Sequence, residues 1–478
     1  MQKQDNHYRN YINGEWRDND KLIKIINPAT EESMASIACA DVNDVNLAVQ
    51  AARACVNSGA MSDPRPVQRA RMLMKISTEL EKLTEEIVPL LVAENGKGLA
   101  EAYAEVATGV RYFEYYAGMA DKIEGKTIPL GKDYVDFTYY EPVGVSAQIV
   151  PWNFPFDVGA RSIAPALAAG NAVVVKSPEL TPLAMTYFAV ACERAGVPKG
   201  AFNLICGYGH EAGAALASHN DIDQIVFTGS VVTGREVLKS AAERAVPCVM
   251  ELGGKSAAVV FPDADLDNLM DNVDWGIFYN AGQVCSAMSR LLVHEDIHDE
   301  VVARVTALAK DQIIGDGIDK KATLTPVASE KQQKTVLDMC ERGVADGATL
   351  ITGGKAADRS GYFVEPTIFK NVMPSSELFQ KEVFGPVLAI TTFKTEEQAW
   401  ELANGTDYGL VAGVFTKDLN IAMQASRELK AGQIFVNEWF AGGVETPFGG
   451  LGLSGFGREK GQEALYSYVN TKNVGIKL

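Results

Sequence analysis

The amino-acid sequence predicts an α/β protein with parallel sheets, and three observations support this fold class. Short β-branched runs alternate with helical stretches through the middle of the chain, as in Ala172–Lys176, a helix near 181–195 and Phe202–Cys206. Alternation of this kind is typical of βαβ units. It resumes after Cys285, which indicates a second α/β domain. The length of 478 residues is sufficient for about three structural units.

Outside the middle third, changes in the period of the apolar residues predict the helices and strands. Apolar residues recur every three or four positions over 73–90, which predicts one helix face that Pro89 kinks or ends. Residues 132–140 then alternate with period two, as in a strand, and a second apolar run follows at Val145–Val150. Residues 474–478 alternate again. A terminal strand with one apolar face needs a sheet edge to pair with, in this chain or in another subunit.

The charge balance excludes several classes of partner. The chain has 44 basic and 61 acidic residues, a formal net charge of −17. Nucleic acids and anionic lipids bind clustered Lys and Arg, so such a field repels both. Hydrophobic residues make up 47% of the chain and charged residues 22%, which favours a globular over a disordered chain. We therefore expect a small-molecule enzyme with no nucleic-acid and no membrane partner.

The cysteines and the N-terminus indicate a cytoplasmic location. The seven cysteines are scattered and form no C-x-x-C pair, which disfavours a disulfide scaffold and a cysteine zinc site. The first residues are polar, without the apolar segment of a secretory signal. The longest apolar stretch, 164–175, is interrupted by Pro165, Gly170 and Asn171 and is too short to span a bilayer. The sequence thus predicts a soluble protein of a reducing cytoplasm.

Two glycine-rich turns favour a dinucleotide ligand. Gly207–Gly213 follows a predicted strand and opens a predicted helix, with one residue more than the dinucleotide fingerprint. Such glycines let backbone N–H groups approach a pyrophosphate, although a tight βα turn explains this segment as well. Phe227–Gly234 repeats the arrangement one unit later. Glu179, just after a predicted strand, would accept the ribose hydroxyls and repel a 2′-phosphate, or would simply cap the next helix.

An H-E-x-x-H pattern at His294–His298 does not predict a metal site. That pattern binds zinc when both histidines lie one turn apart on a helix. Here a strand precedes His294, and Asp296 is expected to cap the following helix, so His294 would lie outside it. We interpret the pattern as a coincidence and expect no metal.

Three residues carry the parts needed for chemistry at a carbonyl. Cys285 follows a glycine turn, Glu251 ends an apolar run before two glycines, and Asn153 lies between two prolines. They offer a nucleophile, a carboxylate and an amide donor. A lone cysteine is more often a core residue, and spacing alone does not bring the three together. A thiol hydrolase would need a histidine beside Cys285, and none of the five histidines lies in a matching motif.

Six motifs in one order resemble the NAD(P)-dependent aldehyde dehydrogenase superfamily over nearly the whole chain. The motifs are Pro151–Pro155, Phe227–Ser230, Glu251–Lys255, Gly282–Cys285, Glu382–Pro386 and Pro447–Gly450. The resemblance implies an aldehyde dehydrogenase fold with a Rossmann-like cofactor domain, an α/β catalytic domain and a small β oligomerisation arm. The expected boundaries are 1–123 and 144–253 for the cofactor domain, 254–455 for the catalytic domain, and 124–143 and 456–478 for the arm. Relatives are homodimers or homotetramers.

The resemblance implies NAD-dependent oxidation of an aldehyde to a carboxylic acid. Cys285 matches the nucleophile that forms a thiohemiacetal and then a thioester. Asn153 and the Cys285 backbone N–H match the oxyanion hole, and Glu251 matches the base that activates water. Because relatives that transfer the acyl group to coenzyme A usually lack this base, the acid is the expected product. A catalytically silent relative is disfavoured, since all three residues are intact.

The resemblance also assigns cofactor contacts. The expected residues are Trp152, Lys176, Glu179, Gly229, Ser230, Leu252, Glu382 and Phe384, of which Glu382 and Phe384 match the nicotinamide side. Glu179 favours NAD over NADP. Lys176 and Glu179 stay in register although Ser177 and Pro178 are exchanged relative to the common motif, and Gly452 replaces a common lysine.

The helix after Pro155 departs from the family pattern. Many relatives carry Trp-Lys where this chain has Arg161-Ser162, and that lysine is assigned a proton relay with the acid matching Glu459. Ser162 cannot replace it, which leaves water as the carrier. Arg161 would form an i, i+4 ion pair with Asp157, or would bind a substrate carboxylate and make the enzyme a catabolic semialdehyde dehydrogenase.

The tunnel mouth leaves a further substrate class open. Trp439 and Phe440 lie where relatives line the entrance of the aldehyde tunnel. An aromatic aldehyde or an aminoaldehyde is therefore the alternative to a carboxylate-bearing substrate.

Overall fold

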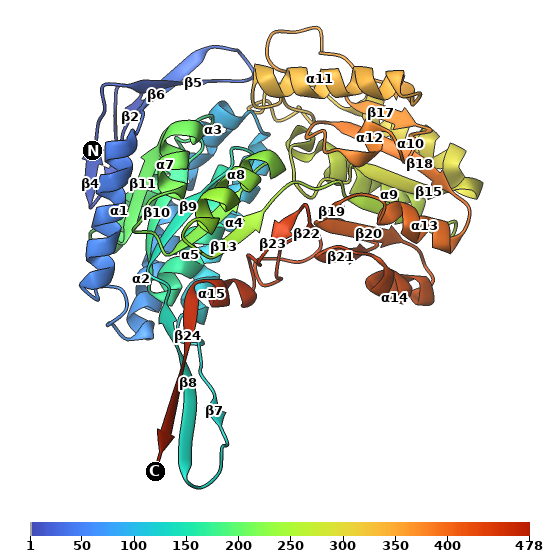
Figure 1. The fold of residues 1–478 in the computed structure, drawn as a ribbon. Helices are drawn as coiled ribbons and strands as arrows, with labels where there is room; N and C mark the ends of the chain where they lie inside the picture. The colour runs from blue at the N-terminus through green and yellow to red at the C-terminus, as the bar shows by residue number, and fades with distance from the viewer. Residues whose placement is uncertain (1) are drawn as a thin grey trace.

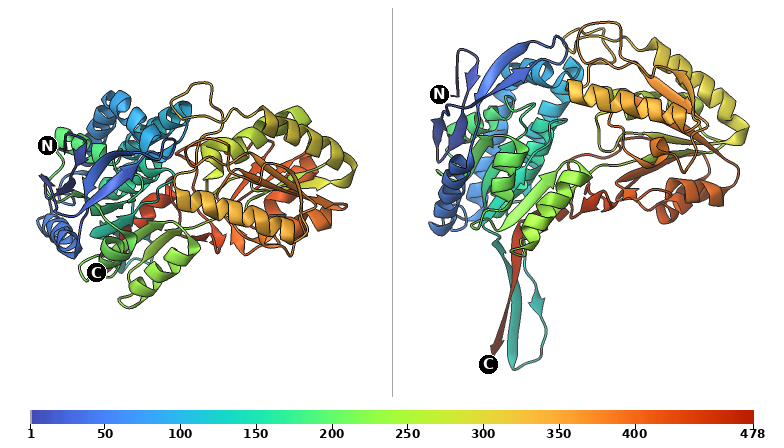
Figure 2. Two further views of the ribbon diagram at one scale, coloured as in Figure 1. Left: turned by 90° about the horizontal axis from the view of Figure 1, so that it is seen from above. Right: turned by 45° about the horizontal axis from the view of Figure 1, so that its top comes forward.

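The computed structural model describes residues 2–478 and consists of two α/β halves with a narrow arm extending from one of them (Figure 1). Viewed from above, the two halves lie side by side (Figure 2). Their buried apolar side chains form two separate large clusters, one in each half. The α/β class predicted from the sequence is confirmed. Among the described residues, no helix is both long and apolar enough to cross a membrane.

The first half is built on an eight-stranded sheet whose order is β23-β13-β12-β9-β10-β11-β3-β4. Its strands are β3 (Asn10–Ile12), β4 (Glu15–Arg17), β9 (Val145–Ile149), β10 (Ala172–Ser177), β11 (Phe202–Cys206), β12 (Gln224–Thr228), β13 (Cys248–Glu251) and β23 (Gly455–Phe456). The five strands from β13 to β11 pair in parallel. They are short, β-branched and almost fully buried, as expected for a sheet covered on both faces.

Helices cover this sheet. They are α1 (Val42–Asn57), α2 (Pro66–Lys82), α3 (Thr84–Asn95), α4 (Leu99–Met119), α5 (Pro155–Ala169), α6 (Thr186–Ala195), α7 (Ala214–Ala217) and α8 (Val231–Ala242). Pro89 does not end the predicted helix, because that helix is interrupted at Leu83 and Pro89 lies inside α3. Proline is tolerated there because it and Glu85 are exposed, so water can satisfy the carbonyl that loses its partner.

The second half contains a seven-stranded sheet of order β16-β17-β18-β15-β14-β20-β21, parallel except for β16. Its strands are β14 (Ala257–Val260), β15 (Arg290–His294), β16 (Thr349–Thr352), β17 (Thr367–Lys370), β18 (Val387–Phe393), β20 (Val411–Phe415) and β21 (Gln433–Val436). Its helices are α9 (Leu266–Val273), α10 (His298–Asp311), α11 (Glu330–Ala345), α12 (Glu377–Gln380), α13 (Glu396–Ala403) and α14 (Leu419–Glu428).

The H-E-x-x-H segment lies at a junction in this half. His294 ends β15 and His298 opens α10, with a 3-10 turn (Glu295–Ile297) between them. His294 therefore lies outside the helix, as expected. The expected cap is wrong, because the His294 side chain, not that of Asp296, accepts the bond from a backbone N–H of the turn.

The arm is a three-stranded antiparallel sheet of order β24-β8-β7 that extends away from both halves (Figure 2). It consists of β7 (Thr127–Ile128), β8 (Tyr134–Pro142) and β24 (Val469–Lys477), and α15 (Glu463–Ser467) precedes β24. The strands predicted from the two period-two segments are confirmed, and they pair with each other. The remaining short strands are β1 (Lys3–Gln4), β2 (His7–Tyr8), β5 (Leu22–Ile26), β6 (Ser33–Ala38), β19 (Tyr408–Gly409) and β22 (Leu451–Gly452).

Candidate active site

A cavity of about 530 Å³ lies between the two halves. The first half contributes residues that follow the carboxyl ends of β9, β12 and β13, which is where open α/β sheets bind ligands. The second half contributes the loop before β15. The cavity brings together Asn153, Glu251 and Cys285, which spacing alone could not place.

The loop that carries Cys285 has a constrained backbone. Asn280, Ala281 and Gly282 have φ of 49°, 53° and 73°, the left-handed region that side chains disfavour. A Cβ on Gly282 would lie 2.1 Å from the carbonyl oxygen of Gly385, so this position requires glycine. Non-glycine residues adopt this conformation only where contacts with the surrounding structure enforce it. Such strained backbone is common at functional sites.

Asn153 contacts this loop directly. Its Nδ2 donates to the carbonyl oxygen of Gln283 at 2.9 Å, and its own carbonyl oxygen accepts from Asn280 Nδ2 at 3.0 Å. An amide nitrogen has two hydrogens, so one remains available to an oxygen bound in the cavity. The Asn153 side chain is thereby held on the same loop as the thiol.

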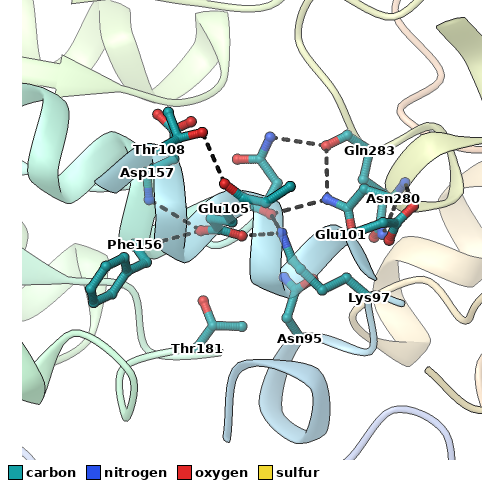
Figure 3. A network of polar contacts seen from close by, with 12 residues as sticks. Asn95, Lys97, Glu101, Glu105, Thr108, Phe156, Asp157, Thr181, Asn280 and Gln283 are labelled. Carbon is teal, nitrogen blue, oxygen red and sulfur yellow. Dashed lines mark hydrogen bonds and ion pairs between the residues drawn. The ribbon is translucent and has the colours of Figure 1, made fainter. Parts of the chain in front are cut away.

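Asn153 also contacts a buried polar network through its backbone. Lys97 and Glu105 of this network are shown in Figure 3. Lys97 Nζ donates to the Asn153 carbonyl oxygen at 2.9 Å and forms an ion pair with Glu105, both side chains being fully buried. Glu105 Oε1 accepts from the backbone N–H groups of Phe156 and Asp157, at 2.9 and 3.2 Å, in the first turn of α5. Sequence reasoning missed Lys97 and Glu105, because no motif links them to the site.

The Cys285 thiol is protonated at neutral pH. Burial raises the pKa of Cys285 to about 12, against the opposing positive charge of Arg161, and the carboxyls of Glu382 and Glu251 add to the rise. The thiolate is the nucleophilic form, so attack requires that a neighbouring group take the proton.

Glu251 is a second ionisable group in this cavity. Its side chain is buried, and neither carboxyl oxygen has a hydrogen-bond partner among the described residues. Burial raises the pKa of Glu251 well above its usual range, Glu459 adds to the rise, and Arg161 and Arg458 oppose it. An unpartnered carboxyl with a raised pKa is suited to general-base catalysis near neutral pH.

Arg161 also lines the cavity, but the ion pair expected along its helix is wrong. Arg161 Nη2 lies 2.5 Å from Glu459 Oε2, and no ion pair joins Arg161 to Asp157 among the described residues. Both paired side chains are more than nine-tenths buried. Removing two ions from water costs free energy, and the close contact between Arg161 and Glu459 offsets part of that cost.

The cavity's other end offers contacts for a dinucleotide. Gly229 and Ser230 line it, and Ser230 caps the twelve-residue helix α8, whose N-terminus favours an anion. Lys176 Nζ pairs with Glu179 Oε2 at 2.7 Å, but neither residue lines the cavity. Burial raises the pKa of Glu179, but the charge and hydrogen bond of Lys176 more than offset this, so the carboxylate is ionised. Gly207–Gly213, the other glycine turn, does not line the cavity.

Glu382 and Phe384 line the cavity beside Trp152. Glu382 Oε1 accepts from the Gly254 N–H at 3.0 Å, and burial raises the pKa of Glu382 to about 7. A Cβ on Gly253 would lie 2.3 Å from Glu382 Oε2. Phe384 has φ of 58°, and its ring meets Trp152 edge-on at 5.3 Å. Leu252 lines the same cavity. Together with α8 and Glu179, these residues fit a dinucleotide.

Much of the remaining cavity lining is aromatic. These rings are those of Tyr112, Phe154, Trp275, Tyr279, Phe435, Phe440 and Phe448. Phe440 lies where the sequence places it, whereas Trp439 does not line the cavity. Trp439 is buried and its Nε1 donates to the Ser286 carbonyl oxygen at 3.0 Å. It therefore contacts the loop that carries Cys285 without lining the cavity. Among the described residues, no histidine lines the cavity.

Comparisons with known proteins give consistent matches over nearly the whole chain. A family model described as "Aldehyde dehydrogenase family" matches residues 16–474. Human retinal dehydrogenase 2 is 41% identical over 473 residues, covering 98% of this chain and 91% of that protein. Aldehyde dehydrogenase 1 of Tanacetum cinerariifolium is 42% identical over 468 residues, covering 97% and 94%. The structure of the aldehyde dehydrogenase of Bacillus cereus with NAD⁺ superimposes with a TM-score of 0.97 at 39% identity, covering 98% and 96% of the two chains.

Proposed function

This chain belongs to the aldehyde dehydrogenase family, and from that premise we propose how its own residues oxidise an aldehyde. The enzyme is an NAD-dependent oxidoreductase that converts aldehydes to carboxylic acids. The expectations of this fold, this reaction and NAD are confirmed. The observation that supports the residue assignment is the presence of Cys285, Asn153 and Glu251 in one cavity.

Cys285 is the nucleophile in this proposal. Its Sγ bonds to the aldehyde carbon, the carbonyl electrons move to oxygen, and the thiol proton passes to a base in the cavity. The uncommitted hydrogen of Asn153 Nδ2 and the Cys285 backbone N–H stabilise the oxyanion of this thiohemiacetal. NAD, when bound, accepts the hydride lost by the substrate. The product left on Cys285 is a thioester.

Glu251 completes the reaction by activating water. Its carboxylate removes a proton as water attacks the thioester carbon, the C–S bond breaks, and the Cys285 thiol is regenerated with a carboxylic acid as product. The missing hydrogen-bond partners of Glu251 support this role, because no other group of the described residues holds either oxygen.

The cofactor side is assigned to the residues around α8 and Glu382. Lys176, Glu179, Gly229, Ser230 and Trp152 would hold the adenosine and pyrophosphate, and Leu252, Glu382 and Phe384 the nicotinamide side. The ionised Glu179 would repel a 2′-phosphate, so we assign preference to NAD over NADP.

For the substrate, the aromatic lining favours an aromatic or extended apolar aldehyde. A carboxylate-bearing semialdehyde is the weaker candidate, because Glu459 already neutralises Arg161. An aminoaldehyde remains the second alternative, with Asp157 in the same cavity.

The arm supports a homodimer or homotetramer. It exposes apolar side chains that a monomer would leave in water, and β24 is an unpaired sheet edge. The exposed apolar residues of the arm are Ile128, Leu130, Tyr134, Val135, Tyr139, Ile476 and Leu478. We place the protein in a reducing cytoplasm, a placement supported by its seven free cysteines.

The test is NADH formation over a panel of aldehydes with wild type, Cys285→Ala and Cys248→Ala. Cys248 is half-buried and lies outside the cavity, so its variant is the matched control. We expect turnover in wild type and the control and none in Cys285→Ala. Full activity of Cys285→Ala would refute the assignment of the nucleophile, and preference for succinic semialdehyde over benzaldehyde would refute the substrate class.

A further inference from the structure

Arg161 places a permanent positive charge in the wall of the catalytic cavity. It lines this cavity together with Glu251 and Cys285, and its side chain is only 7% exposed. An arginine keeps its proton over the whole ordinary pH range. The net charge of the Arg161–Glu459 pair is therefore decided by Glu459.

The residue after Arg161 adds no second ionisable group. Ser162 is buried, and its Oγ donates to the Val158 carbonyl oxygen of the same helix at 2.7 Å. A proton leaving Glu251 in this direction meets a guanidinium that cannot accept it. The pair is thus unsuited to carry protons, but Arg161 lines the same cavity as Glu251 and acts there through its charge.

We propose that the Arg161–Glu459 pair sets the protonation of Glu251 through space, with Arg161 as a positioning residue and not a proton carrier. Arg161 favours the ionised, water-activating form of Glu251, and Glu459 favours the protonated form. This inference rests on the proposed role of Glu251 as the base.

Charges on three segments face Glu251. Arg161 comes from α5, Glu459 and Arg458 from the segment after β23, and Cys285 from the loop before β15. Arg161 lowers the pKa of both Glu251 and Cys285, although burial dominates each. Because no hydrogen bond holds either oxygen of Glu251, its ionisation responds mainly to burial and to these charges.

Other groups face the pair itself. Burial raises the pKa of Glu459, which Arg161 opposes, and burial lowers the pKa of Lys460. The further groups within range of the pair are Asp157, Tyr112, Tyr116 and Tyr468. They are present in every variant below, so they do not account for differences between variants.

The inference predicts opposite shifts for the two partners. Arg161→Met removes a positive charge, so Glu251 binds its proton more tightly. The acidic limb of the pH profile of kcat therefore moves to higher pH. Glu459→Gln removes a negative charge, so the same limb moves to lower pH. Each shift should be about one pH unit or more. In the double variant Arg161→Met/Glu459→Gln, the limb should return to between those of the single variants.

A second readout does not depend on turnover. The rate at which iodoacetamide alkylates Cys285, followed against pH by peptide mass spectrometry, should shift in the same directions, since Arg161 favours the thiolate and Glu459 neutralises Arg161. Glu236→Gln, which removes one partner of an exposed pair on α8, is the control and should shift neither profile. Limbs that stay unmoved, or that move in the same direction in both single variants, would overturn the inference. If instead Glu251→Gln retains full turnover while the alkylation profiles shift oppositely, the base assignment fails and the charge effect stands.

Discussion

The buried pair of Lys97 and Glu105 should be essential to both stability and the position of Asn153. The perturbation is Lys97→Met, which keeps the length of the side chain but removes its charge. Both partners are fully buried, so the variant leaves Glu105 as an unpaired buried carboxyl. Breaking a buried pair in this way costs about 3–5 kcal/mol of the free energy of unfolding.

The same variant also removes the hydrogen bond from Lys97 Nζ to the Asn153 carbonyl oxygen. Complete loss of an oxyanion-hole donor lowers kcat by roughly 10²–10³-fold, which is the upper limit for a residue that acts through Asn153. We therefore expect a kcat reduced by a factor of about 10 or more, with the Kd for NAD unchanged.

The assay is urea denaturation followed by fluorescence, together with NADH formation. Adding Glu105→Gln to Lys97→Met should recover most of the stability, because glutamine still accepts from the N–H groups of Phe156 and Asp157 and carries no charge. It should not restore kcat. Lys239→Met, in an exposed pair, is the control and should change stability by less than about 0.5 kcal/mol. A Lys97→Met variant as stable as this control, or a double variant less stable than Lys97→Met alone, would refute the reasoning.

Two further predictions concern the catalytic loop and the cofactor. Gly282→Ala should abolish turnover and lower the unfolding midpoint in urea, because a Cβ there overlaps the Gly385 carbonyl and the φ of 73° costs an alanine about 1–2 kcal/mol. The control is Gly118→Ala, whose Cβ would meet no neighbouring atom within 4 Å, and it should keep full activity. Equal behaviour of the two variants would contradict the prediction. Glu179→Gln should tighten NADP binding by a factor of about 10 while weakening NAD binding less than that, measured by fluorescence titration, and an unchanged ratio of the two Kd values would be evidence against the role of Glu179.

Local patterns in the sequence predicted the fold well, but they did not predict partners distant in the chain. The strands at Ala172–Ser177 and Phe202–Cys206 were recognisable because a fully buried strand needs a short β-branched run. The helix break at Leu83 was not, because the apolar period continues across it.

The same distinction explains the site. Recognisable motifs contain Asn153, Glu251 and Cys285. No motif indicates the partner of Arg161, for which helix spacing was the only signal. Spacing favoured Asp157, four residues away, but the fold brings Glu459 to Arg161 from the far end of the chain. Lys97 and Glu105 carried no signal, since a lysine and a glutamate eight residues apart are ordinary on any surface.

The thioester on Cys285 offers the most direct measurement of the proposed chemistry. Glu251→Gln would be mixed with an aldehyde that wild type oxidises and with NAD, quenched in acid and digested for mass spectrometry. The account predicts a single burst of NADH, about one per active site, and an acyl group on the peptide that contains Cys285. Continued turnover without this adduct, or an acyl group on another residue, would contradict it.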